Sequence, residues 1–259
     1  MKITTWNING IRARIEGAVA YVREARPDVL CLQEIKTVDE GFPTEAFTDL
    51  GYNVVTHGQK GFNGVALLAL HPLEDVMRGL PGDDGDVQSR YIEATVAAGD
   101  LAVRVASIYL PNGNPVGTEK FPYKLAWMKR LEAHAAALLA SEMPVVLAGD
   151  LNVIPEAQDA KRPDAWRGDA LFQPESRAAF RALGNLGYLD AVRACHPGPG
   201  HYTFWDYQAG AWQKDDGIRI DFQLLSPQAT DRLASAGIDR FTRSWEKPSD
   251  HAPVWTTLV

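Results

Sequence analysis

Short runs of apolar, often β-branched residues alternate along the chain with segments whose apolar residues recur at helical spacing. The short runs predict strands at residues 2–7, 28–34, 52–57, 64–70, 91–110, 144–152, 218–226 and 253–259. The run 91–110 holds two strands joined by a hairpin turn at Gly99-Asp100. Helical spacing predicts helices at residues 15–25, 120–140 and 175–187. The alternation predicts an α/β fold.

The organisation of the chain indicates one domain, residues 1–259. This length is commonly a single domain in α/β or two-sheet proteins, and a hydrophobic content of 46% is typical of a globular protein. No low-complexity tract, repeat or long linker divides it. Residues 155–174 form a proline-rich, charged loop, which is either a surface excursion or a functional segment.

Charge and cysteine content narrow the function classes. The formal net charge of −7 excludes coating of nucleic acid by bulk charge, so phosphate binding needs local basic residues or bridging cations. Cys31 and Cys195 are far apart and do not have metal-site spacing. A disulfide between them is unsupported, and a reducing compartment fits better.

No apolar stretch approaches the ~20 residues of a membrane span, and no signal-peptide pattern opens the chain. We expect a cytoplasmic, soluble protein.

Polar side chains follow several of the predicted strands at the point where each run ends. The residues in question are Asn7, Glu34, Tyr109, Asp150 with Asn152 beyond it, and Asp221. Taken singly, such residues are most often turn formers or helix caps. Taken together, carboxylates and carboxamides meeting at one rim would repel one another without a cation. An oxygen-rich site of this kind suits Mg²⁺ or Mn²⁺.

The segment EKPSDHAPV places Asp250 and His251 between Pro248 and Pro253. Neighbouring side chains on a strand face opposite ways, so the pair can share a site only if the loop bends between them. One carboxylate could then ligate a metal while the imidazole binds a phosphate oxygen; the alternative is a solvated surface turn. A serine-hydrolase triad built on Ser249 fails, because a triad needs three separate elements and the chain has no G-x-S-x-G elbow.

Eight motifs then occur in a fixed order: TTWNINGIRAR, LCLQEIK, GYNVVTHGQKGFNGVALL, YLPNGNP, GDLNVIP, YTFWDY, GIRIDF and EKPSDHAPV. Over residues 2–259 the sequence resembles the exonuclease III and abasic-site endonuclease branch of the DNase I-like metal phosphodiesterases. The resemblance implies a four-layer α/β sandwich of two mostly antiparallel sheets with helices outside. It also implies 3′-to-5′ exonuclease activity on duplex DNA, incision 5′ to abasic sites, and removal of 3′ blocking groups.

The resemblance further implies roles for individual residues. Glu34 is the main ligand of Mg²⁺, with Mn²⁺ as an alternative, and Asp150 is the general base. His251 binds the scissile phosphate, and Asp221 fixes its tautomer. The implied metal site comprises Asn7, Glu34, Asp150, Asn152, Asp250 and His251, with Asn9 near the ion; the implied catalytic group comprises Tyr109, Asp150, Asn152, Asp221 and His251.

Contacts with double-stranded DNA are implied for Lys36, Arg90, Asn112, Lys120, Phe204 and Trp205. Phe204 and Trp205 either wall a small pocket for a base-free sugar or fill the core. Basic residues near the same loops either are solvated or line one face toward the DNA backbone; they are Lys36, Lys60, Arg90, Lys120, Lys124, Arg162, Arg167 and Arg219. The departures from the family pattern are Phe204, where tryptophan is frequent, and Phe222-Gln223.

Two other functions share part of this pattern. Inositol-polyphosphate phosphatases and sphingomyelinases have a similar set of polar residues, but they lack the LQEIK, YLPNG and WDY motifs of this chain. A DNA-binding relative with a dead site is disfavoured because every expected catalytic residue is present. We therefore expect a monomeric enzyme that acts on duplex DNA, especially at abasic sites or 3′ ends, and does not bind membranes.

Overall fold

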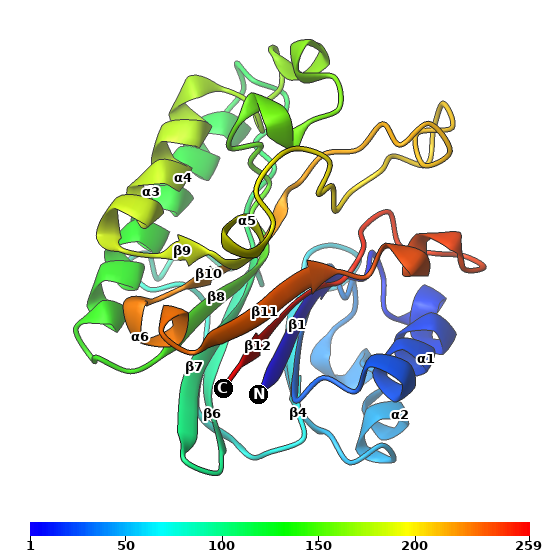
Figure 1. Ribbon diagram of the computed structural model, residues 1–259, viewed down its shortest axis with the longest axis vertical. Coiled ribbons are helices and arrows are strands. Elements are labelled where there is room, and N and C mark those ends of the chain that lie inside the picture. Colours follow the sequence, from blue (N-terminus) through cyan, green and yellow to red (C-terminus); the bar gives the residue numbers. More distant parts are fainter.

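Two six-stranded sheets lie face to face, with helices on both outer faces, in the computed structural model of residues 1–259 (Figure 1). The strands are β1 Lys2–Asn7, β2 Val29–Gln33, β3 Asn53–His57, β4 Val65–Ala69, β5 Leu73–Arg78, β6 Tyr91–Ala98, β7 Leu101–Tyr109, β8 Val145–Asp150, β9 Leu189–Asp190, β10 Asp221–Leu225, β11 Leu233–Ile238 and β12 Val254–Leu258. The α-helices are α1 Ile15–Ala25, α2 Thr44–Thr48, α3 Lys120–Leu139, α4 Pro174–Leu186, α5 Ala191–Cys195 and α6 Pro227–Thr230. Short 3₁₀ turns lie at Arg12–Arg14, Asp39–Gly41, Ala157–Asp159, Pro163–Trp166 and Arg240–Ser244.

The strand order is β11-β12-β1-β2-β4-β3 in the first sheet and β5-β6-β7-β8-β10-β9 in the second. Only the pairs β1–β2 and β7–β8 are parallel, and every other pair is antiparallel. The predicted four-layer sandwich is confirmed. Helices α1 and α2 lie on one side of the sandwich, and α3 and α4 lie on the other (Figure 1).

The hydrophobic core divides into three main clusters, because strand side chains alternate between the two faces of each sheet. Ile3 and Val105 belong to the cluster between the sheets. Trp127 of α3 belongs to the cluster between the second sheet and the helices α3 and α4, and Tyr21 of α1 belongs to the cluster between the first sheet and the helices α1 and α2. Both faces of the central strands are therefore buried, which explains the nearly continuous apolar runs in their sequences.

Two buried glutamines connect the sheets below the rim. Gln33 Nε2 donates to Ser107 Oγ at 2.9 Å. Gln223 Nε2 donates to the carbonyl oxygens of Ile3 and Val254, both at 2.9 Å. Polar bonds of fixed geometry in an apolar layer favour one relative placement of the sheets. Gln223 departs from the family pattern, and the structure assigns it this bridging position.

Most predicted elements are present, including the hairpin, in which Ala98 pairs with Leu101. The prediction missed β5, β9 and β11, all of which are edge strands, and the short helices α2, α5 and α6. Strands β5 and β11 are only partly buried, so their sequences carry charged or small residues in place of an apolar run. No helix combines the length and apolar character needed to cross a bilayer.

Candidate active site

The strand ends bring the predicted polar residues to one rim of the sandwich. Asn7 ends β1 beside Gln33, and Glu34 follows directly on β2. Tyr109 ends β7 opposite Asp150, which ends β8. Asp150 is in turn paired with the first residue of β10, Asp221. Both sheets therefore contribute to the site, and their relative placement sets the distances across it.

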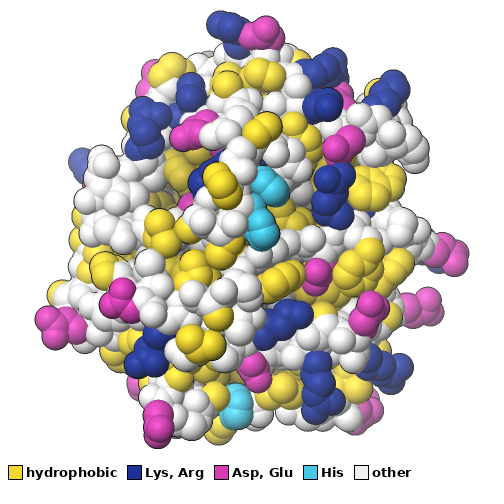
Figure 2. Space-filling model, viewed as in Figure 1, with side chains coloured by type: hydrophobic (Ala, Val, Ile, Leu, Met, Phe, Trp, Pro, Cys, Tyr) yellow, Lys and Arg dark blue, Asp and Glu magenta, His cyan; other side chains and the backbone are white.

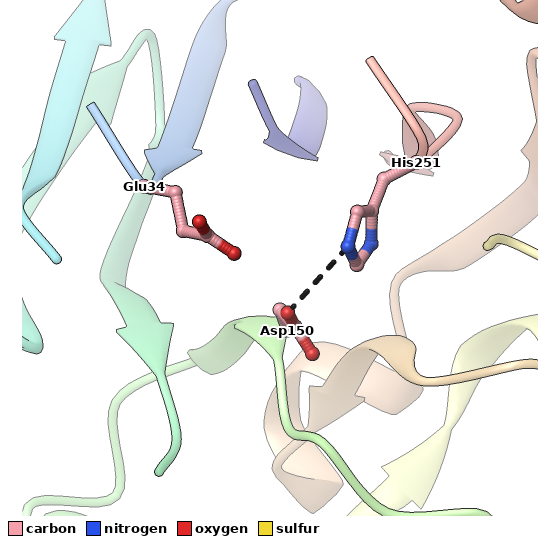
Figure 3. Close-up of side chains that lie close together, drawn as sticks. All are labelled: Glu34, Asp150 and His251. Carbon is pink, nitrogen blue, oxygen red and sulfur yellow. Dashed lines mark ion pairs between the residues drawn. The ribbon is translucent and has the colours of Figure 1, made fainter. Parts of the chain in front are cut away.

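Three side chains from different parts of the chain converge at this rim. Ligand atoms of Glu34, Asp150 and His251 all lie within 4.8 Å of one another. Figure 3 shows the two carboxylates and the imidazole pointing toward a common space. His251 Nε2 lies 3.8 Å from Asp150 Oδ2, the pair joined by the dashed line.

Asn7 bridges the two carboxylates. Its fully buried Nδ2 donates to Glu34 Oε1 at 2.8 Å and to Asp150 Oδ2 at 3.0 Å. Its Oδ1 accepts from the backbone N–H of Asn9 at 3.0 Å, which fixes the orientation of the amide. In this orientation the NH₂ group faces the two carboxylates, and an NH₂ group cannot ligate a cation. Ligation of a metal by Asn7 stays a prediction. Asn7 holds the carboxylates in place.

Burial and neighbouring charges perturb the protonation of the central groups. Burial raises the pKa of Asp150 to about 7; His251 opposes this rise, and the charges of Asp221 and Glu34 add to it. Burial also raises the pKa of Glu34, but the hydrogen bond from Asn7 and the Lys36 ammonium outweigh it, so the net pKa is lowered. The site thus holds one carboxylate that stays charged and one that titrates near neutrality.

His251 is held as a hydrogen-bond donor. Its Nδ1 lies 2.8 Å from Asp221 Oδ2. Burial lowers the pKa of His251, but Asp221 and the neighbouring Asp150 and Asp250 outweigh it and raise the pKa to about 10. A protonated imidazole has no lone pair, so this arrangement favours phosphate binding by His251 over the predicted metal ligation.

The predicted bend at the Asp250-His251 pair is present, and neighbouring residues fix it. Ser249 Oγ donates to the carbonyl oxygen of Asn7 at 2.6 Å and accepts from the N–H of His251 at 3.2 Å. Asp250 Oδ1 accepts from Asn9 Nδ2 at 3.1 Å, so Asp250 lies beside Asn9, outside the group of three converging side chains. Ser249 therefore has a structural role, in agreement with the rejection of a serine-hydrolase triad.

A second row of residues lies on the β7 and β8 side of the rim. Asn152 donates from its backbone N–H to Asp150 Oδ1 at 3.0 Å and accepts at Oδ1 from Asn112 Nδ2 at 3.2 Å. Burial raises the pKa of Tyr109, and the charges of Glu34 and Asp150 raise it further, so this phenol stays protonated. The Arg90 guanidinium lies 4.9 Å from the Tyr109 ring centroid.

Lys36 and Lys120 have different surroundings. The Lys36 ammonium lies 2.9 Å from Glu34 Oε2 and also donates to Asn9. Lys120 lies exposed at the first turn of α3 and makes no side-chain bond to the carboxylate cluster. The structure therefore brings Lys36 into the site and leaves Lys120 at its periphery.

Phe204 and Trp205 separate into different environments. The Phe204 ring packs edge-on against the His251 ring, with 5.0 Å between centroids. Trp205 is fully buried, bonds to Asp215 through Nε1 at 3.0 Å and packs against Trp212. The expectation that Trp205 contacts DNA is wrong, because no part of its side chain is accessible. Phe204 lies beside His251, so its contact with DNA stays a prediction.

Two residues assigned to the basic surface are buried. Arg219 is 3% exposed and pairs with Asp159, and Lys124 is 0% exposed.

Thr203, which the sequence did not single out, is also buried, and its Oγ1 accepts from the N–H of Asp221 at 3.1 Å. Thr203 thus supports the carboxylate that orients His251; its position in the YTFWDY motif gave no signal of this role.

The donor set fits a hard divalent cation. Glu34 and Asp150 offer carboxylate oxygens, and Asp221 Oδ1 is buried without a hydrogen-bond partner. Mg²⁺ is commonly held by one or two carboxylates together with substrate phosphate. Glu34 and Asp150 are therefore the residues that would hold such an ion. When bound, it would neutralise the substrate phosphate and polarise it for attack.

A two-sheet sandwich whose rim carries buried carboxylates, carboxamides and an Asp–His pair defines a class, the metal-dependent phosphoester hydrolases. Residues 4–251 match the endonuclease/exonuclease/phosphatase family, and the chain belongs to this family.

Individual relatives within this family are nucleases and a phosphatase that act on DNA ends or abasic (AP) sites. Exodeoxyribonuclease III of Haemophilus influenzae is 36% identical over 263 residues, covering 98% of each chain. An AP endonuclease from Archaeoglobus fulgidus is 36% identical with a TM-score of 0.93, and the match covers 100% of this chain and 99% of that one. A 3′ phosphatase from Neisseria, solved with a product DNA hairpin, is 35% identical with a TM-score of 0.95 over the same shares. The predicted membership of the exonuclease III branch is confirmed, and the chain is a hydrolytic nuclease.

Proposed function

We propose that this chain is a Mg²⁺-dependent DNA repair nuclease that incises duplex DNA 5′ to abasic sites, removes 3′ blocking groups and degrades duplex DNA from 3′ ends. Mn²⁺ is an alternative ion. The observation that carries the proposal is the convergence of Glu34, Asp150 and His251 within 4.8 Å at the end of the sandwich. We further propose that the enzyme acts as a monomer in the cytoplasm.

The chemistry is assigned to side chains already in place. Asp150 in its ionised form accepts a proton from the attacking water, which general-base catalysis makes about 10²–10⁴-fold faster. His251, protonated and oriented by Asp221, donates to a phosphate oxygen as negative charge develops there. Tyr109, also protonated, lies on the same rim and can donate to an oxygen of the reacting phosphate.

Binding of the substrate relies on local contacts, because the net charge of −7 opposes bulk attraction of DNA. On the face drawn in Figure 2, Lys and Arg side chains are interspersed with acidic and hydrophobic ones. We assign phosphate contacts to Lys36, Arg90, Asn112 and Lys120, and contact with the base-free sugar to Phe204. A few contacts of this kind position the duplex without reading its sequence.

The test is an incision assay on a duplex oligonucleotide with one abasic site, run beside a 3′-recessed duplex. We expect cleavage with Mg²⁺, none with EDTA, and a loss of at least 10²-fold in Asp150→Asn. A soluble phosphoinositide serves as the competing substrate. Hydrolysis of the phosphoinositide without cleavage of either DNA would move the chain to the lipid-phosphatase class, and binding without cleavage under every metal tested would identify a dead-site relative.

A further inference from the structure

A buried lysine lies directly behind the reacting groups. Lys124 projects from the first turns of α3 and is 0% exposed, although a lysine is almost never fully buried without partners. Its Nζ donates to the carbonyl oxygen of Asn112 at 3.0 Å and to that of Asn152 at 2.5 Å. Both acceptors belong to loops at the rim, one after β7 and one after β8.

The second of these loops carries the proposed general base. Asn152 follows Asp150 by two positions, and its backbone N–H donates to Asp150 Oδ1 at 3.0 Å. Asn152 has a φ of +46°, a left-handed conformation that is costly for a residue other than glycine and persists only where surrounding contacts impose it. The bond from Lys124 to the Asn152 carbonyl is one such contact. A chain of two hydrogen bonds thus runs from α3 to the carboxylate of Asp150.

The first loop is shaped around the same side chain. Gly113 has a φ of +88°, and a Cβ added there would lie 2.6 Å from Lys124 Cδ. The chain therefore passes over the lysine stem with no room for a larger residue. Asn112 Nδ2 donates to Asn152 Oδ1 at 3.2 Å, so the two loops that accept from the amine are also hydrogen-bonded to each other.

We propose that Lys124 is a positioning residue for hydrolysis: its amine joins the two rim loops to the rigid helix α3 and so fixes Asp150, Asn152 and Asn112 in their reactive placement, without touching DNA. Both carbonyls can accept from the amine whether it is charged or neutral. Misplacement of a reacting group by about 1 Å can cost 10²-fold in rate, so the bonds matter to turnover even though the lysine is remote from solvent. The proposal rests on the proposed nuclease function.

The experiment compares three lysine-to-methionine variants of the full chain on the abasic-site duplex with Mg²⁺. Lys124→Met keeps the length of the side chain and removes its donors; we expect kcat to fall roughly 10- to 100-fold with KM unchanged. Lys129→Met, at an exposed position of the same helix, is the matched control and leaves both constants unchanged. Lys120→Met removes a proposed phosphate contact; we expect it to raise KM and to reduce the slope of log affinity against log salt by about 0.9.

Folding is separated from positioning by measuring rates well below the thermal midpoint of each variant. Lys124→Gln, which keeps an amide donor on a shorter stem, is the second variant in case Lys124→Met does not fold; we expect an intermediate kcat. The proposal is overturned if folded Lys124 variants keep the wild-type kcat, or if they raise KM and lower the salt slope as Lys120→Met does. If wild type and Lys129→Met also fail to cleave, the nuclease function itself has failed.

Discussion

Replacing Asp150 by asparagine is expected to stabilise the metal-free protein while it abolishes activity. Asp150 is 1% exposed and lies among Glu34, Asp221 and His251, so its ionised form is disfavoured in the folded state. Asparagine has nearly the same shape and carries no charge. The same burial that brings the pKa into the useful range for a general base therefore costs stability, as is common at active sites.

The size of the stability gain follows from the pKa shift of Asp150. This pKa rises from 3.8 to about 7. Since one pKa unit corresponds to 1.36 kcal/mol, keeping the charge of Asp150 in the folded state costs roughly 4 kcal/mol. Asparagine avoids this cost, but it also loses the charge-assisted hydrogen bond that Asp150 Oδ2 accepts from Asn7, because two NH₂ groups would then face each other. The lost bond is worth about 2 kcal/mol. We expect a net gain of about 2 kcal/mol, or ~4–8 °C in Tm for a chain of this size.

The stability difference between wild type and Asp150→Asn should depend on pH in one direction. A raised folded-state pKa means that the folded protein binds more protons than the unfolded chain between pH 3.8 and about 7. The free energy of unfolding of the wild type therefore falls across this window relative to that of Asp150→Asn. The advantage of the variant should grow from pH 5 to 7 and level off near pH 8, below the pH range near 10 in which His251 loses its own proton.

The assay is urea unfolding in EDTA at several pH values, followed by thermal unfolding with increasing Mg²⁺. An ion that binds the folded state stabilises it by mass action, so Mg²⁺ should raise the Tm of the wild type more than that of the variant. Asp84→Asn, at an exposed position, is the control and should match the wild type throughout. An Asp150→Asn protein that is less stable than the wild type in EDTA at pH 8, or a difference that does not vary with pH, would refute the reasoning.

Three further outcomes are expected. Asp221→Asn should lower kcat by about 10²-fold or more and move the alkaline limb of the pH–rate profile to lower pH, because His251 loses the carboxylate that raises its pKa. Gln223→Leu should lower the free energy of unfolding by about 2–3 kcal/mol in urea titrations, since it removes both bonds to strand carbonyls of the other sheet and leaves the buried Thr256 hydroxyl without its acceptor. Trp205→Ala should lower the free energy of unfolding by about 3–5 kcal/mol without changing the ratio of abasic-site incision to exonuclease activity. Phe204→Ala should change that ratio with a smaller loss of stability. Thermal unfolding and paired cleavage assays check both outcomes.

The rim of the site was predictable because a strand that ends in a polar residue has a simple geometric consequence. Glu34 directly follows the buried strand β2 and Asp150 ends the buried strand β8, and a polar residue at a strand end lies at the rim of its sheet. The bend at Asp250 and His251 was also predictable, because flanking prolines restrict the backbone there.

The errors concern burial and long-range contacts. Lys124 was grouped with surface cations, as a lysine normally is, because its two carbonyl partners come from loops that only the folded sheets bring together. Trp205 follows Phe204 directly, and nothing in their order shows which ring faces the core. The amide orientation of Asn7 depends on a bond to Asn9 that spacing alone does not specify.

The placement of β1 beside β12 has a consequence for biosynthesis. The amino group of Met1 bonds to the carbonyl oxygen of Leu258, a separation of 257 positions, and β12 lies between β1 and β11. A growing polypeptide therefore cannot complete the middle of its first sheet until the segment around His251 has emerged from the ribosome. Such distant pairing slows folding. Prematurely ended translation products would lack both the closing strand and the imidazole, and a cell would not be exposed to DNA-cutting fragments.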